Sequence, residues 1–107
     1  MIFQLGELFL ADYGRMLARA MERELPVTVC TIYHPRFPDP TAQRRSVAAL
    51  GLFNDVILRE AFAAGVPVID LRLICTEDAD YANPIEPSAH GGAKIADAIA
   101  TVLRMHD

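Results

Sequence analysis

Two short apolar segments on either side of one long helical segment place the strongest limit on how this chain can fold. Residues 27–33 and 66–71 are apolar and β-branched on both alternating faces, which is typical of strands covered on both sides of a sheet. Residues 40–64 between them carry the apolar periodicity of a helix. A strand, a helix and a strand with short joins form a crossover in which the two strands are parallel. The pattern therefore predicts the α/β fold class.

Local signals mark both ends of the central helix. Asp39 followed by Pro40 is a favourable N-cap and first-turn pair, with Thr41 as an alternative cap. Gly65 is placed to end the helix, because glycine readily adopts the left-handed conformation found just after a helix. We therefore expect a helix that begins near residue 39 and ends near residue 64.

Two further helices and two loops complete the expected organisation. Residues 2–25 predict a first helix, and a last helix is expected after Gly91 and Gly92. The proline-rich residues 34–40 form a loop at the carboxyl end of a strand, where open parallel sheets bind ligands. Residues 72–90 predict a long irregular segment, and such segments are usually functional.

Composition excludes several classes of protein. With 107 residues the chain is expected to form one domain, and its net charge of -4 argues against a nucleic-acid or anionic membrane surface. Two cysteines are too few for a disulfide scaffold and fit a reducing compartment. The sequence has no apolar run long enough to span a bilayer, and its first residues have no basic stretch typical of a signal peptide. We therefore expect a cytoplasmic protein.

Two tracts resemble a known enzyme family. Residues 31–40 read TIYHPRFPDP and residues 81–96 read YANPIEPSAHGGAKIA, and in this order of elements they resemble the C-terminal half of SGNH/GDSL hydrolases. The resemblance implies part of a flavodoxin-like, three-layer α/β/α domain, with two parallel strands and three helices in residues 1–107. It also implies hydrolysis of ester or other acyl small-molecule substrates without a cofactor.

The chain departs from that family's pattern at the nucleophile. It contains no Gly-Asp-Ser motif, and its only Asn-Asp step, Asn54-Asp55, lies within a predicted helix without the preceding Gly-x. By the family's order, the missing residues belong to strands that would precede Met1. We therefore expect a truncated esterase-like segment that lacks the serine nucleophile and is inactive alone.

The family's catalytic Asp-x-x-His motif can be matched in two ways. One register keeps the Pro-Ser step and the glycine at Gly91, and it places Glu86 at the histidine position and Asn83 at the aspartate position. The other register takes His90 as the base, but then no acid stands three residues earlier. We prefer the first register and retain Glu86, Asn83 and His90 as the candidate catalytic residues.

In the first register, the residue at the histidine position would be poorly suited to activate a serine nucleophile. A serine nucleophile needs a base with a pKa near 7 that a third group orients, and an ordinary glutamate is far too weak a base. The hypothesis is therefore that the complete domain is a weak or altered hydrolase. The histidines His34, His90 and His106 show no metal-ligand spacing, so no metal site is expected.

Further polar residues follow the ends of the two predicted strands. His34 and Arg36 lie in the loop after the first strand and are candidate substrate-binding residues. Asp70 ends the second strand, where we expect it to cap the chain or to pair with Arg72 rather than to act in catalysis.

A second function class follows from the predicted strand edge. The strand at residues 27–33 would have an unpaired edge, and such edges recruit partners. The alternative hypothesis is a non-catalytic interaction module that forms a homodimer through this edge.

Overall fold

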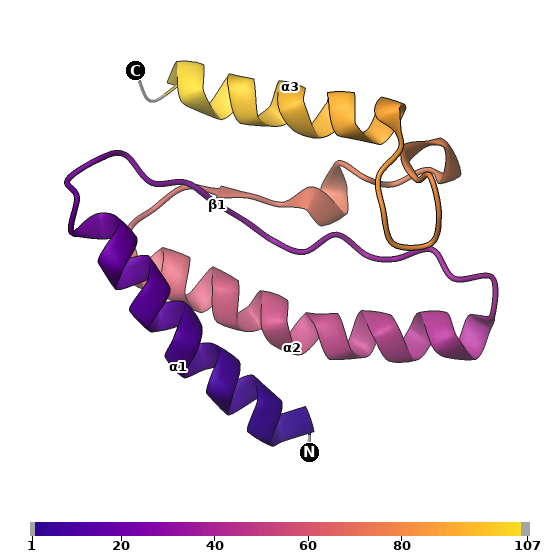
Figure 1. The fold of residues 1–107 in the computed structure, drawn as a ribbon, viewed down its shortest axis with the longest axis horizontal. Coiled ribbons are helices and arrows are strands. Elements are labelled where there is room, and N and C mark those ends of the chain that lie inside the picture. Colours follow the sequence, from indigo (N-terminus) through magenta and orange to yellow (C-terminus); the bar gives the residue numbers. More distant parts are fainter. Residues whose placement is uncertain (1, 106–107) are drawn as a thin grey trace.

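The central crossover is present in the computed structural model, which describes residues 2–105, with side chains from residue 6 onward. Strands β1 (Val29–Cys30) and β2 (Val68–Ile69) are parallel, and Val29 lies opposite Val68. Helix α2 (Pro40–Ala64) connects them across one side (Figure 1). The predicted parallel pair is therefore confirmed.

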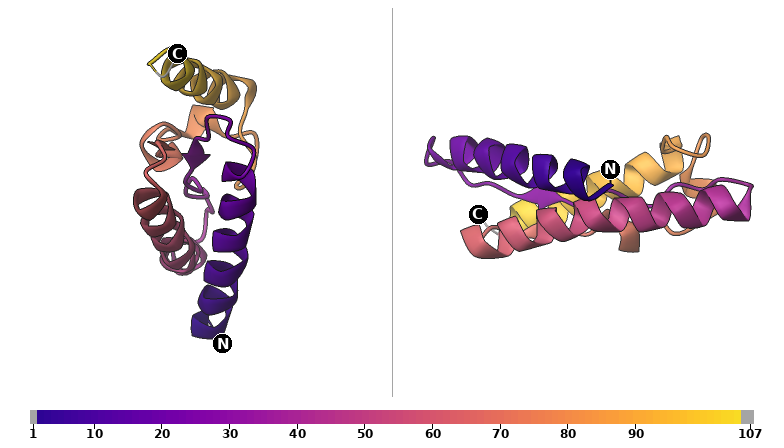
Figure 2. Two further views of the ribbon diagram at one scale, coloured as in Figure 1. Left: turned by 90° about the vertical axis from the view of Figure 1, so that its left-hand side faces the viewer. Right: turned by 90° about the horizontal axis from the view of Figure 1, so that it is seen from below.

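Two more helices enclose the strands. Helix α1 (Ile2–Met21) packs against α2, and helix α3 (Ala89–Met105) lies on the opposite side of the strands (Figures 1 and 2). The described chain is a mixed α/β fold that is mostly helical. None of the helices within residues 2–105 is long and apolar enough to cross a membrane.

The first helix is shorter than the sequence predicts. It ends at Met21 rather than at residue 25, because Glu24 has a positive φ of 56° and Pro26 follows shortly after it. The two strands are also shorter than predicted, with two residues each in place of residues 27–33 and 66–71. A strand requires a neighbour along its length, and the chain turns into a 3-10 helix at Leu71, where the Leu71 N–H donates to the Thr31 side-chain hydroxyl instead of to a β1 backbone carbonyl.

The ends of α2 follow the predicted signals. The Asp39 carboxylate accepts a hydrogen bond from the backbone N–H of Ala42 at 2.9 Å, and Pro40 is the first helical residue. Gly65 adopts the left-handed conformation with φ 71° and closes the helix with backbone hydrogen bonds. The predictions for both ends are confirmed, with Asp39 rather than Thr41 as the cap.

The main apolar core lies between α1, α2 and the strands. Leu17, Val29, Ile57 and Ala61 are buried there and contact one another. The radius of gyration is 15.0 Å, whereas a compact chain of this length has about 13 Å. The core therefore covers only part of the available apolar surface. Large exposed side chains include Leu8, Leu10, Met16, Phe62 and Leu103.

The segment predicted as irregular at residues 72–90 contains short ordered turns. Two 3-10 helices, η1 (Leu71–Leu73) and η2 (Asp78–Asp80), are followed by an isolated antiparallel bridge between Tyr81 and Pro87. Helix α3 begins at Ala89, so Gly91 lies inside its first turns instead of before it as predicted. Gly91 is buried against the backbone of Asp80, and this close approach leaves no room for a side chain.

Candidate functional site

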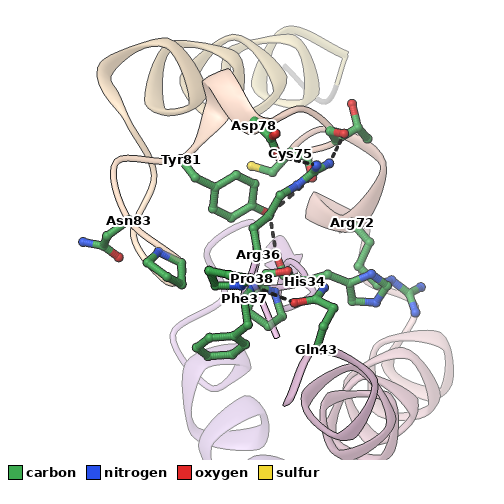
Figure 3. A pocket seen from close by; sticks show the side chains of 13 residues that line it. His34, Arg36, Phe37, Pro38, Gln43, Arg72, Cys75, Asp78, Tyr81 and Asn83 are labelled. Atoms are coloured by element: carbon green, nitrogen blue, oxygen red, sulfur yellow. Dashed lines mark hydrogen bonds and ion pairs between the residues drawn. The ribbon is translucent and has the colours of Figure 1, made fainter. Parts of the chain in front are cut away.

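An open cleft of about 810 Å³ lies between the loop after β1 and the segment that follows β2 (Figure 3). This is the sheet end at which the sequence predicts ligand binding, because the carboxyl ends of both parallel strands meet here. The structure brings both predicted substrate-binding residues, His34 and Arg36, into the lining of this cleft. The rest of the cleft lining comes from the segment that follows β2 and includes Arg72, Cys75, Thr76, Asp78, Tyr81 and Asn83.

Arg36 holds the two sides of the cleft together. Its guanidinium donates to the Asp78 carboxylate at 2.8 Å and to the backbone oxygen of Thr76, and it lies 5.7 Å from the centre of the Tyr81 ring. The Tyr81 hydroxyl donates to the backbone oxygen of His34. Burial raises the pKa of Tyr81, so the phenol stays protonated. Arg36 therefore joins the loop at residues 34–40 to the segment after β2.

Asp70 and Arg72 form the predicted pair at the end of β2. The Arg72 guanidinium donates to both Asp70 oxygens, at 2.8 Å and 2.6 Å, and the Thr31 hydroxyl donates to the same carboxylate at 2.8 Å. The hydrogen bonds from Arg72 are the main reason that the pKa of Asp70 falls to about 2. The pair therefore joins the two strand ends, as expected of a structural rather than a catalytic carboxylate.

Asp80, the last residue of η2, lies next to the cleft-lining Tyr81 in the chain but does not line the cleft, and it has no exposed surface. Its Oδ2 atom accepts hydrogen bonds from the Thr76 and Glu77 backbone N–H groups at 2.9 Å and 3.0 Å, and from the Lys94 ammonium at 2.8 Å. The Lys94 bond is the largest cause of the fall in the pKa of Asp80 to about 2. Asp80 is therefore an anion held in one orientation.

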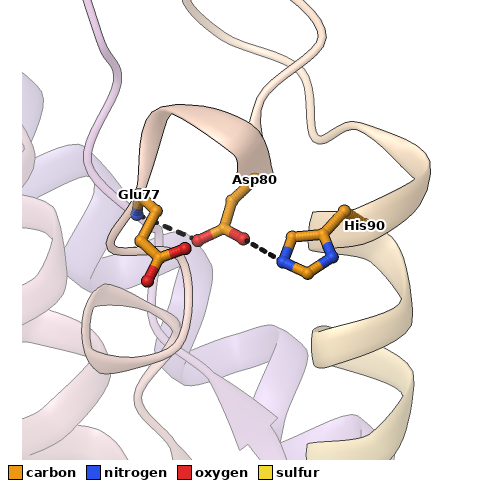
Figure 4. A group of neighbouring side chains, drawn as sticks. All are labelled: Glu77, Asp80 and His90. Carbon is orange, nitrogen blue, oxygen red and sulfur yellow. Dashed lines mark hydrogen bonds and ion pairs between the residues drawn. The ribbon is translucent and has the colours of Figure 1, made fainter.

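The other oxygen of Asp80 faces His90 (Figure 4). Oδ1 is buried and has no hydrogen-bond partner among the described residues, and His90 Nε2 lies 3.5 Å from it. The His90 side chain is 61% exposed on the first turn of α3, whereas the carboxylate is enclosed. A buried carboxylate therefore faces one nitrogen of a largely exposed imidazole.

The two residues of the preferred register have different surroundings. The Asn83 side-chain oxygen accepts hydrogen bonds from the Ile85 and Glu86 backbone N–H groups, at 2.9 Å and 2.8 Å, and so closes a turn. The Glu86 side chain is exposed. Asn83 therefore contacts the backbone of Glu86, whereas His90 is the candidate that has a carboxylate beside it.

Sequence reasoning missed Asp80 as the carboxylate that lies beside His90. It looked for an acid three residues before the histidine, but Asp80 stands ten residues before it and approaches through the turn at η2. The available signal was the length of the segment at residues 72–90, which marked the region but not the residue. Lys94, which orients the carboxylate, lies one turn beyond His90 on the same helix face.

Comparison of the chain with protein-family models, with curated proteins and with solved structures finds no match.

Proposed function

We propose that this chain forms the C-terminal half of an SGNH-type acyl hydrolase domain in which His90 is the general base and Asp80 its acidic partner. The observation that carries the proposal is the 3.5 Å approach of the buried Asp80 Oδ1 to His90 Nε2. Neither residue lines the cleft, but Asp78 and Tyr81, which lie close to Asp80 in the chain, do. Catalytic hydrogen bonds are often long before substrate binds. Residues 81–96 resemble the family's last motif, and His90 is the base in the second of the two registers that the motif allows, although that register did not point to Asp80.

The two side chains have separate chemical roles. The ionised Asp80 holds the imidazole through Nε2 and stabilises the positive charge that His90 acquires. Nδ1 then takes the proton from a serine hydroxyl supplied by a segment outside these 107 residues. His34 and Arg36 line the cleft in which an ester or acyl substrate would lie.

The arrangement of elements supports a flavodoxin-like domain of which this chain is one part. Helices α1 and α2 on one side of the parallel strands and α3 on the other are the layers that such a domain needs. Two strands alone make a marginal sheet, and the radius of gyration of 15.0 Å indicates incomplete packing. Additional strands beside β1 would complete the sheet and bring a nucleophile to the cleft.

A fusion protein tests the proposal and decides between the two registers. The N-terminal half of a serine-bearing SGNH hydrolase is joined to residues 1–107, and short-chain ester hydrolysis is measured after circular dichroism confirms folding. We expect His90→Gln to lower kcat by about 10³-fold, within the range for loss of a general base. The matched variant Glu86→Gln should retain activity. Activity that depends on Glu86 and not on His90 would reverse the assignment.

The imidazole tautomer provides an independent test in the metal-free 107-residue chain. Because Nε2 faces the Asp80 carboxylate, neutral His90 should carry its proton on Nε2. Nitrogen-15 NMR of the imidazole distinguishes the two tautomers, and His34 is the internal control. A neutral His90 protonated mainly on Nδ1 would contradict the proposed pair.

A second candidate function is homodimerisation through the free edge of β1. The Val29 and Thr31 N–H groups point toward β2, where they donate to Pro67 and Ile69. Because successive strand residues direct their backbone groups to opposite sides, those of Thr28 and Cys30 point away from β2. A second copy of this chain could pair with this edge and extend the sheet.

The mass of the protein in solution tests this candidate. The unmodified chain should sediment as a dimer, and Thr28→Pro should yield a monomer, because proline removes an edge N–H that β2 does not use. Circular dichroism of the variant should match that of the unmodified chain. A folded monomer without the substitution would exclude dimerisation as the function of the edge.

A further inference from the structure

We propose that Glu77, Asp80 and His90 form a binding site for a divalent transition metal, Zn²⁺ above all. One ligand atom from each residue, two carboxylate oxygens and an imidazole nitrogen, lies within 4.8 Å of the others (Figure 4). This inference rests on the geometry of the three side chains. It uses the Asp80 Oδ1 and His90 Nε2 atoms of the proposed catalytic pair, so the metal-bound site and the hydrolytic pair would be alternative states of the same residues.

The buried oxygen of Asp80 is the observation that points to a bound cation. A carboxylate oxygen without any hydrogen-bond donor is costly to bury, yet Oδ1 is enclosed and has no such partner among the described residues. The 3.5 Å to His90 Nε2 is longer than a good hydrogen bond. A cation between the two atoms would satisfy both of them.

The spacing fits a tetrahedral metal. Zinc binds imidazole nitrogen at 2.0–2.1 Å and carboxylate oxygen at about 2.0–2.2 Å, so two ligand atoms of a tetrahedral site lie about 3.4 Å apart. The observed 3.5 Å between Asp80 Oδ1 and His90 Nε2 matches this separation. Glu77 is exposed and can move its carboxylate the remaining distance, and water would supply the fourth ligand.

Neighbouring groups hold the Asp80 carboxylate, one of the three proposed metal ligands, in a fixed orientation. Oδ2 is bound by Lys94 and by the Thr76 and Glu77 backbone N–H groups, which leaves Oδ1 for the metal. Such outer hydrogen bonds orient ligands in metal sites. An imidazole with two carboxylates favours Zn²⁺ over Mg²⁺, which prefers an all-oxygen octahedral shell. Because the imidazole must be neutral to bind, affinity should decrease as the pH is lowered.

Zinc titration of the 107-residue chain tests the site. With a chromophoric chelator as competitor, we expect one Zn²⁺ per chain, and His90→Gln and Glu77→Gln should each weaken binding by at least about tenfold. His34→Gln and Glu86→Gln are the matched controls and should bind as the unmodified chain does. Asp80 is left unchanged because its loss would disturb the fold. Failure to bind zinc, or equal binding by all four variants, would overturn the proposal.

Cobalt substitution distinguishes this site from binding by the free thiols. Cys30 and Cys75 are both free, and Cys75 is buried with a pKa raised chiefly by burial. Tetrahedral Co²⁺ held by Glu77, Asp80 and His90 should absorb in the visible range without a thiolate charge-transfer band. A strong thiolate band would overturn the assignment. Because these tests measure binding alone, their failure would leave the acyl hydrolase proposal untouched, and loss of hydrolysis in the fusion would leave the metal site untouched.

Discussion

The contact between Gly91 and the Asp80 backbone allows a direct test of how closely α3 packs against the turn at η2. A Cβ atom at residue 91 would lie 2.8 Å from the Asp80 carbonyl carbon and still nearer to its oxygen. Backbone cannot rotate away as a side chain can, so Gly91→Ala must push α3 off the turn at η2. At Gly92, one residue further along the same helix, a Cβ atom would meet nothing within 4 Å.

The two substitutions should therefore change stability in opposite directions. Overpacking costs about 1–3 kcal/mol, and the upper end applies here because the obstacle is backbone. Replacing glycine with alanine stabilises a helix by about 1 kcal/mol, and this gain applies at either position. We expect Gly91→Ala to lower the free energy of unfolding by about 2 kcal/mol and Tm by about 10 °C. Gly92→Ala should raise Tm by about 5 °C.

Thermal and urea unfolding followed by circular dichroism measure both effects. The comparison is internal, because both variants make the same chemical change in one helix. If Gly91→Ala were as stable as Gly92→Ala, the close packing of α3 on the Asp80 turn would be wrong. The placement of His90 beside Asp80 would then lose its structural basis.

Two other predictions concern groups that join the strands to their surroundings. Asn54 is fully buried and bonds both the N–H and the C=O of Ile32, at 2.7 Å and 2.9 Å, so Asn54→Ala should lower the free energy of unfolding by about 2–4 kcal/mol in urea titrations. The exposed neighbour variant Asp55→Ala should lower it by less than about 0.5 kcal/mol, and equal losses would contradict the role given to Asn54. The pKa of Asp70 falls from 3.8 to about 2 on folding, so its stabilising contribution is complete above about pH 4 and is lost as the pH falls toward 2. Urea midpoints measured across this range should decrease less steeply for Asp70→Asn than for the unmodified chain, and parallel curves would show that the bond to Arg72 does not stabilise the fold.

Local patterns were sufficient to predict the crossover. The apolar runs, the cap at Asp39 and the glycine at Gly65 act through backbone preferences and periodicity, which depend on neighbours in the sequence. Strand length was predicted less well, because a strand ends where its hydrogen-bond partner ends. Here the Leu71 N–H donates to the Thr31 hydroxyl, 40 residues away in the sequence, so the end of the strand pair is decided by a tertiary contact.

By itself, the sequence determined that two parallel strands flank a long helix and that the loops after them meet at one end. The tertiary structure alone decided that Asp80, rather than a residue of the expected motif, stands beside His90. Both the turn at η2 and the missing side chain at Gly91 are needed for that approach. Only in the folded chain is Asp80 buried, with Lys94 bound to one carboxylate oxygen and the other oxygen facing the imidazole.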